Sequence, residues 1–93
     1  MAIIYSEHLK NRIKQRGFPD HYPKEIYDEP KFKFRDILEN NFIAIKKMLY
    51  GGKMKEIMIC YTKKGQDVKI ISIHPIRNNQ IQNRIKNKRW IKI

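Results

Sequence analysis

The apolar residues near the start of the chain are spaced as on an amphipathic helix. Ser6 is a suitable N-cap, and Gly17 stands where a helix commonly ends in glycine, so a helix is predicted over about residues 6–16. Leu9 and Ile13 would form its buried stripe, because residues four apart lie on the same side of a helix. The first element is therefore expected to pack on the rest of the protein through this stripe.

From Lys31 onward, apolar residues recur with the period of two that is typical of strands. Basic and aromatic residues alternate over residues 31–35 and predict a half-buried strand. Longer apolar segments separated by turn residues follow and predict three further strands, over residues 42–50, 53–62 and 67–74. Between the first two of these, Gly51-Gly52 predicts a two-residue hairpin turn.

Two more helices complete the pattern. Pro23 suits a first helical position and predicts a short helix to about Asp28, and a last helix is expected from about Asn78, with Ile81 and Ile85 toward the sheet. The expected fold class is α+β: an antiparallel sheet of about four strands packed by two N-terminal helices and one C-terminal helix. A length of 93 residues predicts a single domain over residues 1–93.

The charge favours a polyanionic partner. The chain has 21 Lys and Arg against nine Asp and Glu, a formal net charge of +12, and no acid lies within residues 68–93. Nucleic acid is the leading candidate partner, through phosphate neutralisation, and an acidic protein is the second. No membrane partner is expected, since there is no apolar run of ~18 residues. A single cysteine, Cys60, in an apolar segment indicates an inert buried thiol and a cytoplasmic protein.

Basic residues near the two ends of the chain are the candidate functional residues. His8, Arg12 and Arg16 would form a row on the first helix, and the C-terminal part contributes another group: His74, Arg77, Arg84, Lys88 and Trp90. A fold that brought both ends together would make one cationic groove with two histidines, suited to RNA. His21 is expected in an exposed turn without a role. The histidines and the cysteine show no metal-ligand spacing, so neither a metal site nor a cofactor is expected.

Two segments resemble small toxins of toxin–antitoxin systems. The N-terminal motif resembles the opening of a small toxin–antitoxin domain family, in which a His and two Arg precede a Gly and an apolar residue: His8-x3-Arg12-x3-Arg16-Gly17-Phe18. A later segment is similar to the last strand and following arginine of BrnT-like toxins, which belong to the RelE/ParE-like group: Val68-Lys69-Ile70-Ile71-Ser72-Ile73-His74-Pro75-Ile76-Arg77.

The resemblance implies the toxin of a type II toxin–antitoxin system, a metal-independent endoribonuclease that inhibits translation and is silenced by a small antitoxin. Its chemistry would be attack of a ribose 2′-hydroxyl on the adjacent phosphate, which needs a base, an acid and cations over the phosphorane. His8 or His74 would move the protons. The implied phosphate ligands are Arg12, Arg77 and Arg84, and Arg16 would reach the RNA backbone nearby. Lys88 would also bind RNA, Tyr61 would stack on a base or orient a proton, and Trp90 would stack on single-stranded RNA.

Two other functions use the same residues. A non-catalytic basic module that binds nucleic acid would need the same charge, and so would a catalytically inactive domain that binds an acidic protein partner. His74 beside a proline would then be structural, whereas Tyr61 and Trp90 would only pack in the core.

Overall fold

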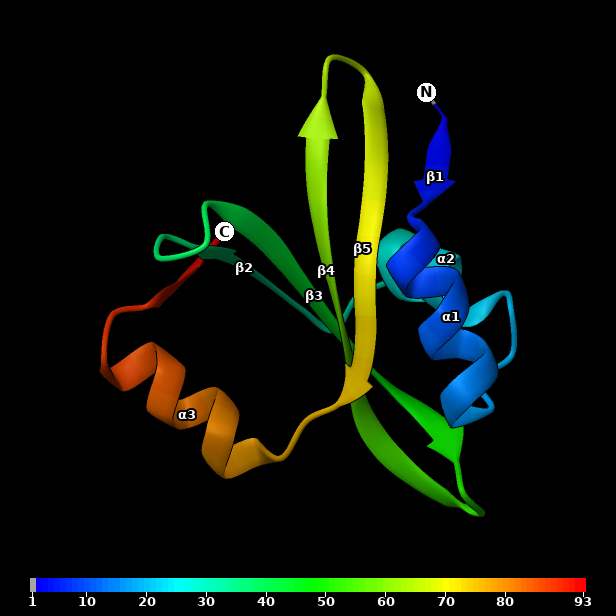
Figure 1. Ribbon diagram of the computed structural model, residues 1–93. Helices are drawn as coiled ribbons and strands as arrows, with labels where there is room; N and C mark the ends of the chain where they lie inside the picture. Colours follow the sequence, from blue (N-terminus) through cyan, green and yellow to red (C-terminus); the bar gives the residue numbers. More distant parts are fainter. Residues whose placement is uncertain (1) are drawn as a thin grey trace.

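The computed structural model describes residues 2–93 of the chain and consists of one twisted sheet with three helices (Figure 1). The helices are α1 (Glu7–Arg16), α2 (Tyr22–Asp28) and α3 (Asn78–Lys86). The strands are β1 (Ile3–Tyr5), β2 (Phe32–Asp36), β3 (Asn41–Tyr50), β4 (Lys53–Lys64), β5 (Asp67–Pro75) and β6 (Trp90–Lys92). The α+β class, the three helices and the four strands expected from the sequence are confirmed.

The sheet is mixed and has six strands in the order β1-β5-β4-β3-β2-β6. β1 runs parallel to β5, and the other neighbouring strands are antiparallel. The prediction of a purely antiparallel sheet of about four strands is therefore wrong. The two missed strands, β1 and β6, have three residues each, too few for a hydrophobic alternation to be readable in the sequence.

The helices lie on opposite faces of the sheet (Figure 1). The face under α1 and α2, here the α1 face, holds a core that includes Leu9, Ile13 and Ile26 from the helices and Ile57, Ile59, Tyr61, Val68, Ile70 and Ile73 from the strands. The opposite face, here the α3 face, holds a second core of Phe34, Ile43, Ile45, Met58, Ile76, Ile81 and Trp90. In α3 only Ile81 is buried, whereas Ile85 is 39% exposed, contrary to the expectation that both face the sheet.

The turns follow the glycines. Gly51 and Gly52 form the predicted hairpin turn with φ of 62° and 78°, values that glycine adopts without steric cost. Gly17 ends α1 at φ 70°, with its N–H bonded to the carbonyl of Ile13. Over residues 2–93, no helix is long and apolar enough to span a membrane.

Candidate functional site

A β-bulge in β5 decides which face His74 occupies. Cys60 of β4 pairs with Ser72, but the next residue, Tyr61, pairs with Ile70, so Ile71 is an extra residue in β5. Because side chains alternate along a strand, this insertion moves the following residues to the other face. His74 pairs with Met58 and therefore points to the α3 face.

Ser6 fixes α1 beside this bulge. Its hydroxyl accepts the N–H of Leu9 at 3.0 Å as an N-cap and donates to the carbonyl of Ile71 at 2.9 Å. Its backbone N–H also donates to the carbonyl of Ile70 at 3.0 Å. The start of α1 is thus hydrogen-bonded to the bulge of β5, which determines the face to which His74 points. From there α1 continues along β5.

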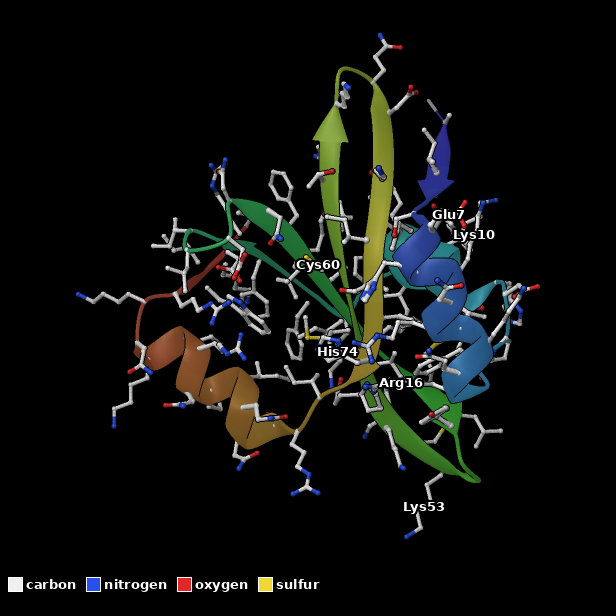
Figure 2. The ribbon with its side chains drawn as sticks, in the orientation of Figure 1. Glu7, Lys10, Arg16, Lys53, Cys60 and His74 are labelled. Atoms are coloured by element: carbon white, nitrogen blue, oxygen red, sulfur yellow. The ribbon has the colours of Figure 1, made fainter. Side chains whose placement is uncertain are left out.

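Three arginines from both ends of the chain act on His74. The pKa of His74 is lowered, first by burial and then by the positive charges of Arg16 and Arg12 on α1 and of Arg84 on α3. Figure 2 shows Arg16 close to His74 in that view. A lowered pKa keeps the imidazole neutral at pH 7, so that a ring nitrogen can accept a proton. The arrangement expected from the sequence, basic residues of both ends around a histidine, is present at this position.

His8 belongs to the same group through Arg12. The Nε of Arg12 donates to Nε2 of His8 at 3.5 Å, one helical turn away, and the His8 side chain is exposed. We call His8, Arg12, Arg16, His74 and Arg84 the His74 cluster.

Arg84 is held over a tryptophan that is itself anchored. Its guanidinium carbon lies 5.3 Å from the ring centroid of Trp90, a cation–π contact. The Nε1 of Trp90 donates at 3.1 Å to Asp36, whose carboxylate is buried and also accepts Arg89 Nε at 3.3 Å and the N–H groups of Leu38 and Glu39. The buried carboxylate of Asp36 thus positions Trp90, and Trp90 in turn positions Arg84, whose charge acts on His74.

Arg77 and Lys88 do not join the cluster. Both side chains are exposed, and neither is among the charges that lower the pKa of His74. Arg77 is the N-cap residue of α3, and its N–H donates to Gln80 Oε1 at 3.0 Å. Lys88 lies between α3 and β6 with φ 60°. Arg77 thus has a capping position at the start of α3.

The two aromatic residues expected to stack on RNA bases are buried. Tyr61 is 0% exposed and packs on the α1 face, with its ring stacked on Phe42 and edge-on to Tyr27. Burial raises the pKa of Tyr61 to about 12, so its hydroxyl stays protonated at neutral pH. Trp90 is 2% exposed and stacks on Phe34. Neither ring has a free face for a base, and we leave both out of direct RNA contact.

The remaining cysteine and histidine side chains of the chain are Cys60 and His21. Burial, followed by the carboxylates of Asp36 and Glu39, raises the pKa of Cys60 to about 11, so this thiol is protonated, as the apolar segment around it indicates. His21 is exposed in the turn before α2. Among residues 2–93, no three His, Cys, Asp or Glu side chains are grouped to hold a metal ion.

Sequence reasoning missed Ser6 as a link to β5 and Asp36 as an anchor. A signal existed only for the bulge that Ser6 contacts, because Val68, Ile70 and Ile73 are all apolar at spacings that an unbroken period of two does not permit. The partners of Asp36 are 53 and 54 residues away in sequence, and no local pattern indicates them.

No protein-family model, no curated protein and no solved structure matches this chain.

Proposed function

We propose that this protein is a metal-independent endoribonuclease, the toxin of a type II toxin–antitoxin system, as the resemblance to BrnT-like toxins of the RelE/ParE-like group implies. The observation that carries the proposal is the placement of a half-buried His74 with a lowered pKa among Arg12, Arg16 and Arg84. A neutral imidazole among fixed cations suits proton abstraction beside a phosphate.

The proposed reaction uses His74 as the general base. His74 takes the proton of a ribose 2′-hydroxyl, whose oxygen attacks the adjacent phosphorus, and the bond from phosphorus to the 5′-oxygen breaks. The products are a 2′,3′-cyclic phosphate and a 5′-hydroxyl that takes its proton from water. Arg12, Arg16 and Arg84 stabilise the phosphorane through charge-assisted hydrogen bonds. His8 orients Arg12 through the 3.5 Å hydrogen bond between them.

The partners proposed are single-stranded RNA, free or on the ribosome, and a small antitoxin. Support for RNA comes from the net charge of +12 and from the convergence of arginines that are far apart in sequence. With both stacking candidates buried, recognition would depend on phosphates more than on bases, and cleavage would have a weak sequence preference. The proposed location is the cytoplasm, where messenger RNA is translated.

The test is cleavage of end-labelled single-stranded RNA in a chelator by four purified proteins. The wild type is compared with His74→Asn, Arg84→Gln and Arg77→Gln, the last as a matched control that removes an exposed arginine outside the cluster. Loss of a general base should slow cleavage by about 100-fold or more. Arg84→Gln should slow it clearly, and Arg77→Gln should cleave like the wild type.

Other outcomes would identify the alternatives. Salt-sensitive RNA retention without cleavage, on free RNA and on translating ribosomes alike, would support the non-catalytic binding module instead. Equal losses in Arg77→Gln and Arg84→Gln would remove the cluster as the site, because the effect would then follow net charge alone.

A further inference from the structure

The outermost strand, β6, has backbone groups that point away from the sheet. β6 pairs with β2 such that Ile91 lies opposite Arg35, and two hydrogen bonds to β2 flank this pair. They join Ile37 N–H to the Arg89 carbonyl at 3.0 Å and Ile93 N–H to the Lys33 carbonyl at 3.2 Å. Because bonding residues alternate along an antiparallel strand, the N–H and C=O groups between them point outward. These are the groups of Trp90 and Lys92.

Exposed apolar side chains gather beside this open edge. Ile91 on β6 and Ile93, directly after it, are 49% and 57% exposed. Ile37 and Leu38, directly after β2, are 51% and 71% exposed. The hydrogen bond between Ile37 and Arg89 brings Ile37 and Leu38 next to the start of β6. Exposed apolar side chains adjacent to one another indicate an interaction surface, whereas isolated ones do not.

This surface lies on the face opposite His74. Ile91 is opposite Arg35, Arg35 opposite Phe42, and Phe42 opposite Tyr61, so these side chains share the α1 face. The two helices of that face do not extend over this part, because α1 packs on β5 and α2 on β3 and β4. The β2 end of the α1 face therefore lies beyond its helices.

The same surface is positively charged. Lys33 and Arg35 lie on the α1 face of β2 next to the isoleucines, and Arg35 and Lys63 both lie over the ring of Phe42, with their cationic groups 5.8 and 5.1 Å from its centroid. We call Ile37, Leu38, Ile91 and Ile93, together with Lys33 and Arg35, the β6 edge surface. A partner that matches this surface needs free backbone hydrogen-bonding groups for β6, apolar side chains for the isoleucines and leucine, and acidic side chains for Lys33 and Arg35.

We propose that the β6 edge surface binds an extended acidic segment of a partner protein, which adds to the sheet as a further strand. Main-chain hydrogen bonds to Trp90 and Lys92 would give affinity, and alternating apolar and acidic side chains would meet the isoleucines and the cations. A second copy of the chain fits less well, because it would bring another +12 charge and a second Lys92 to the same edge. RNA would use the cations but leave the isoleucines in water.

The test uses a ten-residue peptide of alternating Glu and Val with blocked ends, added to isotopically labelled protein. We expect hydrogen exchange of the Trp90 and Lys92 amides to slow at least tenfold on binding. A peptide of alternating Glu and Ser has the same charge and should bind at least tenfold more weakly. Ile91→Glu should weaken binding of the Glu-Val peptide at least tenfold, whereas Met54→Glu, the same change at a residue 57% exposed in the β3–β4 hairpin, should weaken it less than threefold.

Four results would overturn the proposal. The first is that neither peptide binds, and the second is that both bind with equal affinity. The third is protection of the Trp90 and Lys92 amides without peptide that increases with protein concentration. The fourth is protection of the same two amides by a short RNA. The third would identify a second copy as the occupant, and the fourth a nucleic acid. The inference does not depend on the proposed ribonuclease, since Ile91→Glu should leave RNA cleavage unchanged.

Discussion

The hydroxyl of Ser6 donates a hydrogen bond to the carbonyl of Ile71 at 2.9 Å, which joins the N-cap of α1 to the extra residue of the β5 bulge. The bulge sets the face of His74, and α1 carries Arg12 and Arg16. One side chain therefore keeps His74 and the two arginines of α1 in a fixed relation, although these arginines and His74 are about 60 residues apart in sequence.

Replacing Ser6 with alanine should destabilise the fold. Both hydrogen bonds of the hydroxyl are lost, and removal of an N-cap side chain costs about 1–2 kcal/mol. Urea denaturation followed by circular dichroism gives the free energy of unfolding. Ser6→Thr, which keeps a hydroxyl, is the control and should lose far less. Equal losses in the two variants would show that packing at this position, rather than the hydroxyl, holds α1 to β5.

The charge of Arg84 should be measurable at His74 without any substrate. In Arg84→Gln the pKa of His74 should rise, because a cation that disfavours the imidazolium is removed. Titration of the imidazole by NMR measures this directly. Arg77→Gln removes the same charge from the exposed N-cap of α3, outside the cluster, and should leave the pKa of His74 where it is. A rise of equal size in both variants would contradict the placement of Arg84.

Asp36 should stabilise the C-terminal part of the fold. Burial alone would raise the pKa of Asp36, but hydrogen bonds from the Glu39 N–H, Arg89 and Trp90 outweigh it, and the pKa is lowered. Asp36→Asn removes the charge that accepts hydrogen bonds from Arg89 and Trp90 and should cost about 2 kcal/mol of unfolding free energy, the order of magnitude of a hydrogen bond to a charged group. Glu39→Gln removes the exposed partner of Arg89, 3.7 Å away, and should cost under about 1 kcal/mol.

The sign of the pH dependence gives a second check on Asp36. Since its folded-state pKa is lower than that of the unfolded chain, its stabilising contribution is complete above the unfolded value of about 4 and is lost as the pH falls through the folded value. The wild type should lose this contribution in acid, and Asp36→Asn should not. Parallel stability curves for the two proteins below pH 4 would contradict the role assigned to the carboxylate.

The hydroxyl of Tyr61 should be dispensable. It is buried and has no hydrogen-bond partner within the described part of the chain. Tyr61→Phe should therefore leave stability unchanged or raise it, and should leave RNA cleavage unchanged. Tyr5→Phe is the matched comparison, since the Tyr5 hydroxyl donates to the Asp20 carbonyl at 2.7 Å and accepts the Lys24 N–H at 3.2 Å; its loss should cost about 1 kcal/mol. Impaired cleavage by a stable Tyr61→Phe protein would restore Tyr61 to the site.

Local patterns in the sequence were sufficient for the helices and the four longer strands. Leu9 and Ile13 at helical spacing, the cap residues Ser6 and Gly17, and the Gly51-Gly52 turn all act through neighbours within a few residues, and each is confirmed. The short strands β1 and β6 were not predictable, because they form through pairing with β5 and β2, far along the chain.

The site was partly predictable for the same reason. The row of Arg12 and Arg16 follows from helix geometry, but its approach to His74 depends on the packing of α1 on β5, which no local pattern indicates. The placement of Trp90 and Tyr61 in the two cores could not, because an aromatic residue in a strand has the same local pattern whether its ring is covered or free. Long-range packing alone decides that difference.

The most direct test of the central claim is cleavage of a single-stranded RNA, in a chelator, with one 2′-deoxynucleotide placed 5′ to a mapped cleavage site. Attack by the 2′-hydroxyl predicts that cutting stops at that bond, continues at others and leaves 2′,3′-cyclic phosphates, all of it abolished in His74→Asn. Cutting at the deoxynucleotide, or full activity of His74→Asn, would contradict the proposed chemistry.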